Sequence, residues 1–264
     1  MENTYWHKQS ADKPLFSDLL WSRPENKRTA GKLLIIGGNI HGFSAVGQAY
    51  QYAQKAGVGS TRIILPDVLQ KTVSKLLPDA LFTASTPSGS FSQQALADLI
   101  ENAAWADGVI LSGDLARNSE TAILLEKFAS KYSGQLTLTK DALDYFVNFP
   151  NAITQRPSTT LVLTIAQLQR LANAIKFKIA FTFDMDLLKL VSSLHELTTS
   201  LQINIVVKHL DTIFVAVNGR VSTTKTNYRD EETWRNPIAA SASVWWLQNP
   251  TKTFEAITTS MIQT

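Results

Sequence analysis

Four apolar segments of the chain end in glycine or in polar residues, which are the residue types suited to holding a polar ligand. The first segment, "LLII" at 33–36, stops at two consecutive glycines. Glycine allows the backbone to approach a ligand closely, and carboxyl, amide and ammonium groups supply the hydrogen bonds that orient it. The candidate ligand-binding residues at the four segment ends are Gly37, Gly38, Asn39, His41, Ser112, Gly113, Asp114, Asp141, Lys208 and His209.

Each of these features also has a purely structural interpretation. The "GGNIHG" segment (37–42) matches neither the dinucleotide-binding fingerprint nor the phosphate-binding loop, so its glycines could equally form a tight turn. Asp114 either caps the helix that follows it or faces a ligand. The acidic segment 184–186 fits the start of a helix better than a metal site. The four histidines lack metal-binding spacing and the chain has no cysteine, so no metal site is predicted.

The elements that must position these residues alternate along the chain. Apolar runs predict strands, and apolar residues at helical spacing predict helices. The pattern is typical of an α/β fold with a mostly parallel sheet covered on both faces, with the 203–221 region as an antiparallel hairpin at its edge. In such sheets ligands bind at the carboxyl ends of the strands, where all four segment ends fall. The expected strands are 32–37, 61–65, 80–85, 108–114, 135–139 and 160–164, and the expected helices are 44–56, 68–77, 92–105, 118–132, 140–147, 165–175, 184–201 and 237 onward.

Length and composition favour one soluble domain. The chain has 264 residues, of which 44% are hydrophobic and 18% are charged, as in ordinary globular proteins. We expect an arm over 1–30 that packs on a single α/β domain over 31–264. The net charge of +3 does not favour a nucleic-acid partner, and no apolar run approaches the roughly 20 residues that cross a membrane. Because the N-terminus lacks the signal-peptide pattern, we expect a cytoplasmic protein; whether it forms a homo-oligomer stays open.

Taken in order, five segments resemble motifs of the ribokinase-like NAD(P)H-hydrate dehydratases. Segment 26–39 stands where the family has H-K-G-x-x-G-x-V-L-V-I-G-G, and 44–57 is similar to its small, alanine-rich helix that ends in A-G. The G-P-G-L-G loop and helix resemble 112–128, and the D-A-D-A-L segment resembles 138–146. The V-L-K-G strand end and hairpin resemble 205–221. The resemblance covers nearly the whole chain, although no single motif matches in full.

This resemblance implies a ribokinase-like three-layer sandwich and an activity. The family uses ATP or ADP to dehydrate damaged, hydrated NAD(P)H, so the implied ligands are a nucleotide, with Mg²⁺ as a candidate companion, and the NAD(P)H hydrate as substrate. Asp141 falls on the second aspartate of D-A-D-A-L, and Lys208 falls on the lysine of V-L-K-G. Gly37 and Gly38 then lie at the edge of the nucleotide cleft.

Two segments depart from the family pattern. Where the family has T-P-H-P-G-E, segment 164–171 reads "TIAQLQRL" and keeps only the threonine. Where the family has G-T-G-D, which supplies an anion hole and a general base, 234–237 reads "WRNP". Proline removes a backbone donor, although Asn236 and Pro237 still suit the N-cap and first position of a helix. Loss of a general base typically slows a reaction by roughly 10²–10⁴-fold.

Replacements for the missing groups lie nearby in the sequence. Asp230, Glu231 and Glu232 are the candidates for the missing general base, and Arg235 could neutralise a phosphate in place of the anion hole, with Asn236 beside it. Three functions therefore stay open: a divergent NAD(P)H-hydrate dehydratase, a non-catalytic relative that binds a nucleotide or a partner, and a small-molecule kinase of the ribokinase superfamily.

Overall fold

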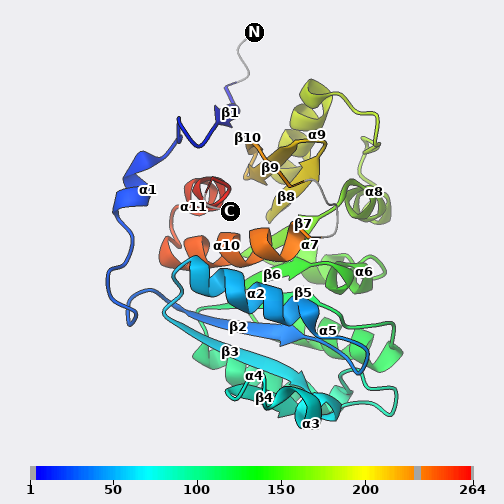
Figure 1. Ribbon diagram of the computed structural model, residues 1–264. Coiled ribbons are helices and arrows are strands. Elements are labelled where there is room, and N and C mark those ends of the chain that lie inside the picture. Colours follow the sequence, from blue (N-terminus) through cyan, green and yellow to red (C-terminus); the bar gives the residue numbers. More distant parts are fainter. Residues whose placement is uncertain (1–3, 229–232, 263–264) are drawn as a thin grey trace.

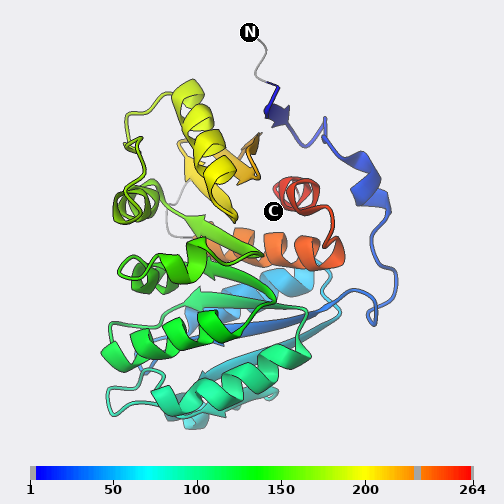
Figure 2. The ribbon, with the colours of Figure 1, turned by 180° about the vertical axis from the view of Figure 1, so that it is seen from behind.

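A computed structural model describes residues 4–228 and 233–262, which form a ten-stranded sheet with helices on both faces (Figures 1 and 2). The strand order across the sheet is β1-β10-β9-β8-β7-β6-β5-β2-β3-β4. The strands are β1 (Trp6–Gln9), β2 (Lys32–Gly37), β3 (Ser60–Pro66), β4 (Ala80–Thr83), β5 (Gly108–Gly113), β6 (Gln135–Thr139), β7 (Thr159–Leu163), β8 (Ile203–His209), β9 (Thr212–Val217) and β10 (Arg220–Lys225). The predicted α/β fold with a mostly parallel sheet is confirmed.

The helices lie mainly in the connections between strands. Two of the predicted starts are confirmed by capping bonds: Ser92 accepts from the Gln94 amide, and Asp186 of the acidic segment accepts from the Lys189 amide. The helices are α1 (Ser17–Trp21), α2 (Ser44–Lys55), α3 (Gln70–Val73), α4 (Leu96–Trp105), α5 (Ser119–Lys131), α6 (Asp141–Phe146), α7 (Asn151–Thr154), α8 (Ile165–Ala174), α9 (Leu187–Ser200), α10 (Arg235–Gln248) and α11 (Thr253–Ser260), with 3₁₀ turns at Asp67–Leu69 and Gln93–Ala95.

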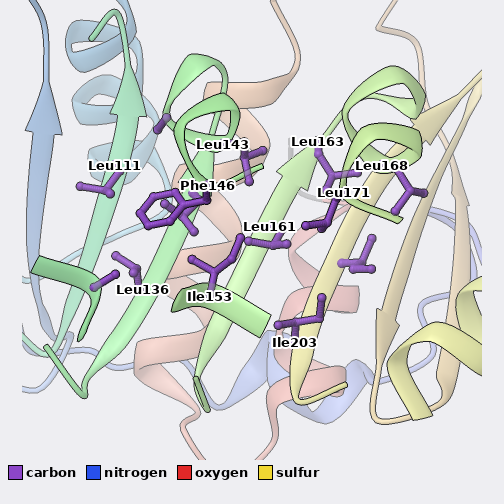
Figure 3. Packing of buried hydrophobic residues seen from close by; sticks show 14 of the residues in the cluster. Leu111, Leu136, Leu143, Phe146, Ile153, Leu161, Leu163, Leu168, Leu171 and Ile203 are labelled. Carbon is purple, nitrogen blue, oxygen red and sulfur yellow. The ribbon is translucent and has the colours of Figure 1, made fainter. Parts of the chain in front are cut away.

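Both faces of the sheet are buried, which explains the nearly continuous apolar strands. In β2, Leu33 and Ile35 pack on the face that α2 and α10 cover, whereas Leu34 and Ile36 pack on the opposite face. Figure 3 shows the second face, where Leu136 and Leu161 of the sheet lie beneath side chains of α6 to α8. Successive strand residues point to opposite faces, so a strand covered twice needs apolar residues at every position. Among the described residues no helix is long and apolar enough to cross a membrane.

The antiparallel side of the sheet is larger than the sequence predicts. The expected hairpin is present as β8 and β9, and β10 pairs antiparallel with β9 beyond it. The N-terminal segment then adds β1, which runs parallel to β10 with Trp6 opposite Val221. This strand was not predicted, because its partner lies more than 200 positions away and leaves no local pattern.

Two helix predictions require correction. The helix expected over 68–77 is a 3₁₀ turn followed by the four residues of α3. Helix α10 begins at Arg235, with Trp234 as its N-cap residue, so the prediction of Asn236 as N-cap and Pro237 as first position is wrong. Proline is compatible with this start because amides in the first helical turn have no carbonyl partner within the helix. The fully buried Trp234 anchors the start of α10 in the core cluster against β7 to β9.

Candidate functional site

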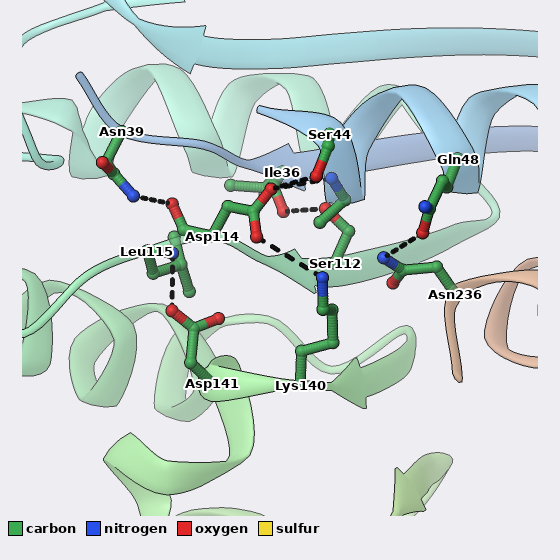
Figure 4. A network of polar contacts seen from close by, with 11 residues as sticks. Ile36, Asn39, Ser44, Gln48, Ser112, Asp114, Leu115, Lys140, Asp141 and Asn236 are labelled. Carbon is green, nitrogen blue, oxygen red and sulfur yellow. Dashed lines mark hydrogen bonds and ion pairs between the residues drawn. The ribbon is translucent and has the colours of Figure 1, made fainter. Parts of the chain in front are cut away.

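The carboxyl ends of β2, β5 and β6 meet at one edge of the sheet and bring the first three candidate segments together (Figure 4). The Gly38 amide donates to the Gly113 carbonyl at 3.0 Å. A Cβ atom on Gly37 would lie 2.5 Å from Ser112 Oγ and 2.6 Å from the Gly113 carbonyl oxygen, so only glycine fits there. Gly113 has φ +100°, which also favours glycine. These glycines are therefore required for the close approach of the two strand ends.

Asp114 is the centre of this edge, and it caps a helix other than the one expected. Its Oδ2 accepts from the Ala45 amide at 2.7 Å, at the start of α2. The cap of the following helix, α5, is Asn118 instead, whose Oδ1 accepts from the amides of Glu120 and Thr121. The carboxylate of Asp114 thus occupies the position at the α2 N-terminus where a bound anion would otherwise be favoured.

Asn39 and Ser112 hold the loop backbone in place. The buried Asn39 donates through Nδ2 to the Asp114 carbonyl at 2.5 Å, and its Oδ1 accepts from the His41 amide at 2.7 Å. The buried Ser112 hydroxyl donates to the Ile36 carbonyl at 3.2 Å. By contrast, the His41 side chain is exposed. Asn39 and Ser112 therefore use their polar groups within the protein, whereas the ring of His41 is accessible.

Asp141 has a partly satisfied carboxyl group. Its Oδ2 accepts from the Leu115 amide at 2.8 Å, while its Oδ1 is buried and has no hydrogen-bond partner among the described residues. Burial raises the pKa of the Asp141 carboxyl above its usual value, and the Asp114 carboxylate adds to the increase, while the backbone amides of Leu115, Asp114 and Asp141 partly oppose it. A buried acceptor without a donor is unfavourable in the protein alone, so Oδ1 is the least satisfied oxygen of the Asp141 carboxyl group.

Lys140 belongs to the site although the sequence analysis did not single it out. Its ammonium lies 3.5 Å from Asp114 Oδ1, with both side chains about one-fifth exposed. Its φ of +54° is left-handed, and its carbonyl accepts from Gln167 Nε2 at 2.7 Å. Asp114 itself has φ +57°. Left-handed backbone at residues other than glycine costs of order 1–3 kcal/mol and is frequent at functional sites. The sequence feature that points to Lys140 is its position directly after the predicted strand 135–139.

The departure at 164–171 has a clear structural use. Thr164 and Gln167 form a capping box at the start of α8, in which the Thr164 hydroxyl accepts from the Gln167 amide and Gln167 Oε1 accepts from the Thr164 amide. Gln167 Nε2 also donates to Asp144 Oδ1 at 3.0 Å. Where the family pattern has His, Pro and Gly, this chain therefore has a helix start. The Gln167 side chain at this start donates to the Lys140 carbonyl.

The remaining candidates lie farther along the sheet or at α10. Lys208 is buried at the end of β8, which is separated from β6 by β7. His209 Nε2 lies 3.1 Å from the Met185 carbonyl oxygen. Asn236 is buried, with its Nδ2 3.5 Å from Gln48 Oε1 of α2, and its Oδ1 has no hydrogen-bond partner among the described residues. Arg235 is half-buried at the first position of α10.

The three acidic candidates for the general base, Asp230, Glu231 and Glu232, lie outside the described residues. Within the described ranges no group of three or more His, Asp or Glu side chains is arranged to hold a metal ion. We refer below to Asn39, Ser112, Asp114, Lys140 and Asp141 as the carboxyl-edge cluster. Its charged groups are two carboxylates and one ammonium, and its least satisfied atom is Asp141 Oδ1.

Comparison with solved structures identifies the fold. A ribokinase-like superfamily protein from Enterococcus faecalis V583 superposes with a TM-score of 0.75, and the match covers 99% of this chain and 87% of that chain at 16% identity. The fold is ribokinase-like. The predicted three-layer sandwich is thereby confirmed, with the sheet between α2, α10 and α11 on one face and α4, α5, α8 and α9 on the other.

Two other solved structures with a similar fold carry named activities. An ADP/ATP-dependent NAD(P)H-hydrate dehydratase from Bacillus subtilis, co-crystallised with ATP/Mg²⁺, matches with a TM-score of 0.62 at 14% identity, over 94% of this chain and 86% of that chain. A phosphomethylpyrimidine kinase from Clostridium difficile 630 matches with a TM-score of 0.56 at 11% identity, over 88% and 97% of the two chains. The sequence matches no family model and no curated protein. At these identities the likeness is one of fold.

Proposed function

We propose that this chain binds an adenine nucleotide at the carboxyl edge of its sheet and acts as an NAD(P)H-hydrate dehydratase-like protein. The observation that carries the proposal is Asp141, whose buried Oδ1 has no donor among the described residues and whose pKa is raised by burial. Perturbed, incompletely satisfied carboxyl groups are typical of ligand-binding and catalytic sites. Further support comes from the ribokinase-like dehydratase that was co-crystallised with ATP/Mg²⁺.

The residues of the carboxyl-edge cluster fit parts of a nucleotide. Asp141 Oδ1 suits a hydroxyl or amine donor, and the Lys140 ammonium suits a phosphate oxygen. Arg235 at the start of α10 offers a second cation. Since the described residues group no three carboxylates or histidines, a Mg²⁺ ion here would take most of its ligands from phosphate oxygens and water. Nucleotide-borne Mg²⁺ is therefore compatible with this donor set.

Dehydration also needs a group that accepts a proton. The first turn of α10 carries no acidic residue, and its start is filled by the buried Trp234. The proposed base is therefore one of Asp230, Glu231 and Glu232, which precede α10 in the sequence. The same observation favours a second candidate function, a non-catalytic relative that keeps the nucleotide site without the dehydratase chemistry.

The test separates binding from turnover. We would measure the melting temperature of the protein with ATP, ADP and NADH, each with and without Mg²⁺, and compare the wild type with Asp141→Asn. A ligand at roughly 100 times its Kd adds about 2.7 kcal/mol, and each kcal/mol raises Tm by about 2–4 °C in a domain of this size. Asp79→Asn is a matched control, because Asp79 is exposed and lies outside the site.

The outcomes distinguish the two candidates. Binding of nucleotide together with regeneration of NADH from its hydrate supports the dehydratase, and loss of that activity in a Glu231→Gln or neighbouring variant would identify the base. Binding without turnover supports the non-catalytic relative. If no nucleotide raises the melting temperature of the wild type, both proposals fail.

A further inference from the structure

A cavity lies between α2 and α10, away from the carboxyl-edge cluster. It has a volume of about 260 Å³ and is lined by Arg23, Tyr52, Lys55, Ala56, Tyr228, Ser241 and Trp245. Tyr52 and Lys55 lie in the last turn of α2, whereas Asp114 caps the first turn of that helix. The cavity therefore lies beside the last turn of α2 and the middle of α10, and Arg23 of the N-terminal arm contributes to its wall.

The charged side chains that the described part of the chain contributes to this cavity are both cations. Arg23 donates through Nη2 to the Ala56 carbonyl, and its guanidinium carbon lies 4.7 Å from the centroid of the Trp245 ring. Lys55 Nζ lies 4.5 Å from the centroid of the Tyr52 ring. The described lining residues include no carboxylate. Arg23 is partly buried and burial lowers its pKa, whereas Lys55 is exposed.

The neutral groups of the cavity are also hydrogen-bond donors. Burial raises the pKa of the Tyr228 phenol to about 12, with the neighbouring Tyr52 adding to the increase, so this phenol keeps its proton at neutral pH. Ser241 adds a hydroxyl group. The indole Nε1 of Trp245 is buried without an acceptor among the described residues. The side chains of Arg23, Lys55, Tyr52, Tyr228, Ser241 and Trp245 can each donate a hydrogen bond, and the acceptor recorded among the described lining residues is the Ala56 carbonyl, which accepts from Arg23.

We propose that this cavity binds a small phosphorylated molecule. A phosphate monoester carries close to two negative charges at neutral pH, which match the two cations, whereas a carboxylate would balance only one. Arginine and hydroxyl donors suit the several oxygens of a phosphate group. The volume of 260 Å³ lies just below the roughly 300–1,000 Å³ of drug-sized pockets, which limits the ligand to a small molecule.

The experiment uses the full-length protein and three probes: inorganic phosphate, phenyl phosphate and, as the singly charged control, acetate. Isothermal titration calorimetry would give each Kd for the wild type, Lys55→Met and Arg23→Met. Because a hydrogen bond to a charged group contributes about 1.5–3 kcal/mol, we expect each variant to bind phosphate at least roughly tenfold more weakly. Lys75→Met is the matched control, since Lys75 is an exposed lysine outside the cavity, and it should bind as the wild type does.

Two further variants keep the result interpretable. Arg23→Met also removes a structural hydrogen bond, so Ser241→Val, which removes one donor and adds bulk to the cavity wall, provides a second test that should weaken binding without changing charge. Lys140→Met reports on phosphate that binds at the carboxyl edge and should leave this site unaffected. Failure of inorganic phosphate and phenyl phosphate to bind, or binding that Lys140→Met weakens and Lys55→Met does not, would overturn the proposal.

Discussion

Replacing Asp141 by asparagine should stabilise the protein at neutral pH while weakening the proposed nucleotide site. In the wild type one carboxyl oxygen accepts from the Leu115 amide and the other is buried without a donor. Leaving a buried polar group unsatisfied costs about 1–3 kcal/mol, and more when it is charged. Asparagine keeps the acceptor for Leu115 and removes the charge.

The size of the expected change in the free energy of unfolding follows from two opposing effects. The variant is relieved of the buried charge, although a neutral amide nitrogen without a partner takes the place of Oδ1, and its bond to the Leu115 amide weakens from a charge-assisted to a neutral hydrogen bond, a loss of about 1 kcal/mol. The net expectation is a gain of about 1 kcal/mol, or a rise in Tm of about 2–4 °C. Urea unfolding monitored by circular dichroism would measure the free energy of unfolding of both proteins.

The pH dependence of this gain provides a sharper test. The folded-state pKa of Asp141 is raised above the ordinary value of 3.8, so the folded protein binds the proton more tightly than the unfolded chain does. The stability associated with this proton is fully present below pH 3.8 and is lost as pH rises through the folded pKa. The advantage of Asp141→Asn should therefore be largest at neutral pH and shrink on acidification. A variant that is less stable at neutral pH, or a difference independent of pH, would refute the reasoning.

Three other substitutions test the surroundings of the site. Asp114→Ala should lower the free energy of unfolding by about 1 kcal/mol through loss of the α2 cap, whereas Asp114→Asn, which keeps a good capping residue, should cost much less in the same urea titration. Lys140→Gly should relieve the left-handed backbone and raise Tm slightly while it weakens ATP binding, both of which a thermal-shift titration would record. Arg156→Lys should destabilise the fold by roughly 3 kcal/mol in urea, because the buried guanidinium donates to the carbonyls of Tyr132, Gly134, Pro157 and Ser158; an effect below 1 kcal/mol would contradict this assignment.

The sequence predicts the interior of this fold well because the interior is specified by local pattern. Strands such as β2 and β5 are buried on both faces, so their apolar runs stand out, and the helices between them keep regular spacing and caps. The edge strands are different. Segment 6–9 becomes a strand because β10 offers it a partner, and the Trp6 indole donates to Thr223 Oγ1 at 3.0 Å. Nothing within the segment itself encodes that pairing.

In the candidate site, too, the features that depend on local sequence could be predicted and those that depend on distant partners could not. The glycines at 37, 38 and 113 were identifiable because only that residue type fits a close approach of two strand ends. The role of Asp114 was not, since its capping partner, Ala45, lies 69 positions earlier in the sequence and belongs to a different helix. Lys140 was overlooked for a similar reason: a lysine after a strand has no distinctive signature until the fold places Asp114 and Gln167 around it.

The way the carboxyl edge is satisfied limits where a phosphate can lie. The amide at the start of α2 already donates to Asp114, so a ligand phosphate there would meet a carboxylate instead of free donors. At α10, Pro237 removes one amide and the buried Trp234 occupies the space that glycines would leave open. Asp114 therefore takes the place of a bound anion at α2, and Pro237 leaves one donor fewer at α10. We expect side chains to contribute to holding any nucleotide phosphate, and Lys140 and Arg235 are cations that the described part of the chain places at these two positions. Side-chain cations lose binding strength in salt more readily than an enclosed backbone site, so a nucleotide site of this kind should depend strongly on ionic strength.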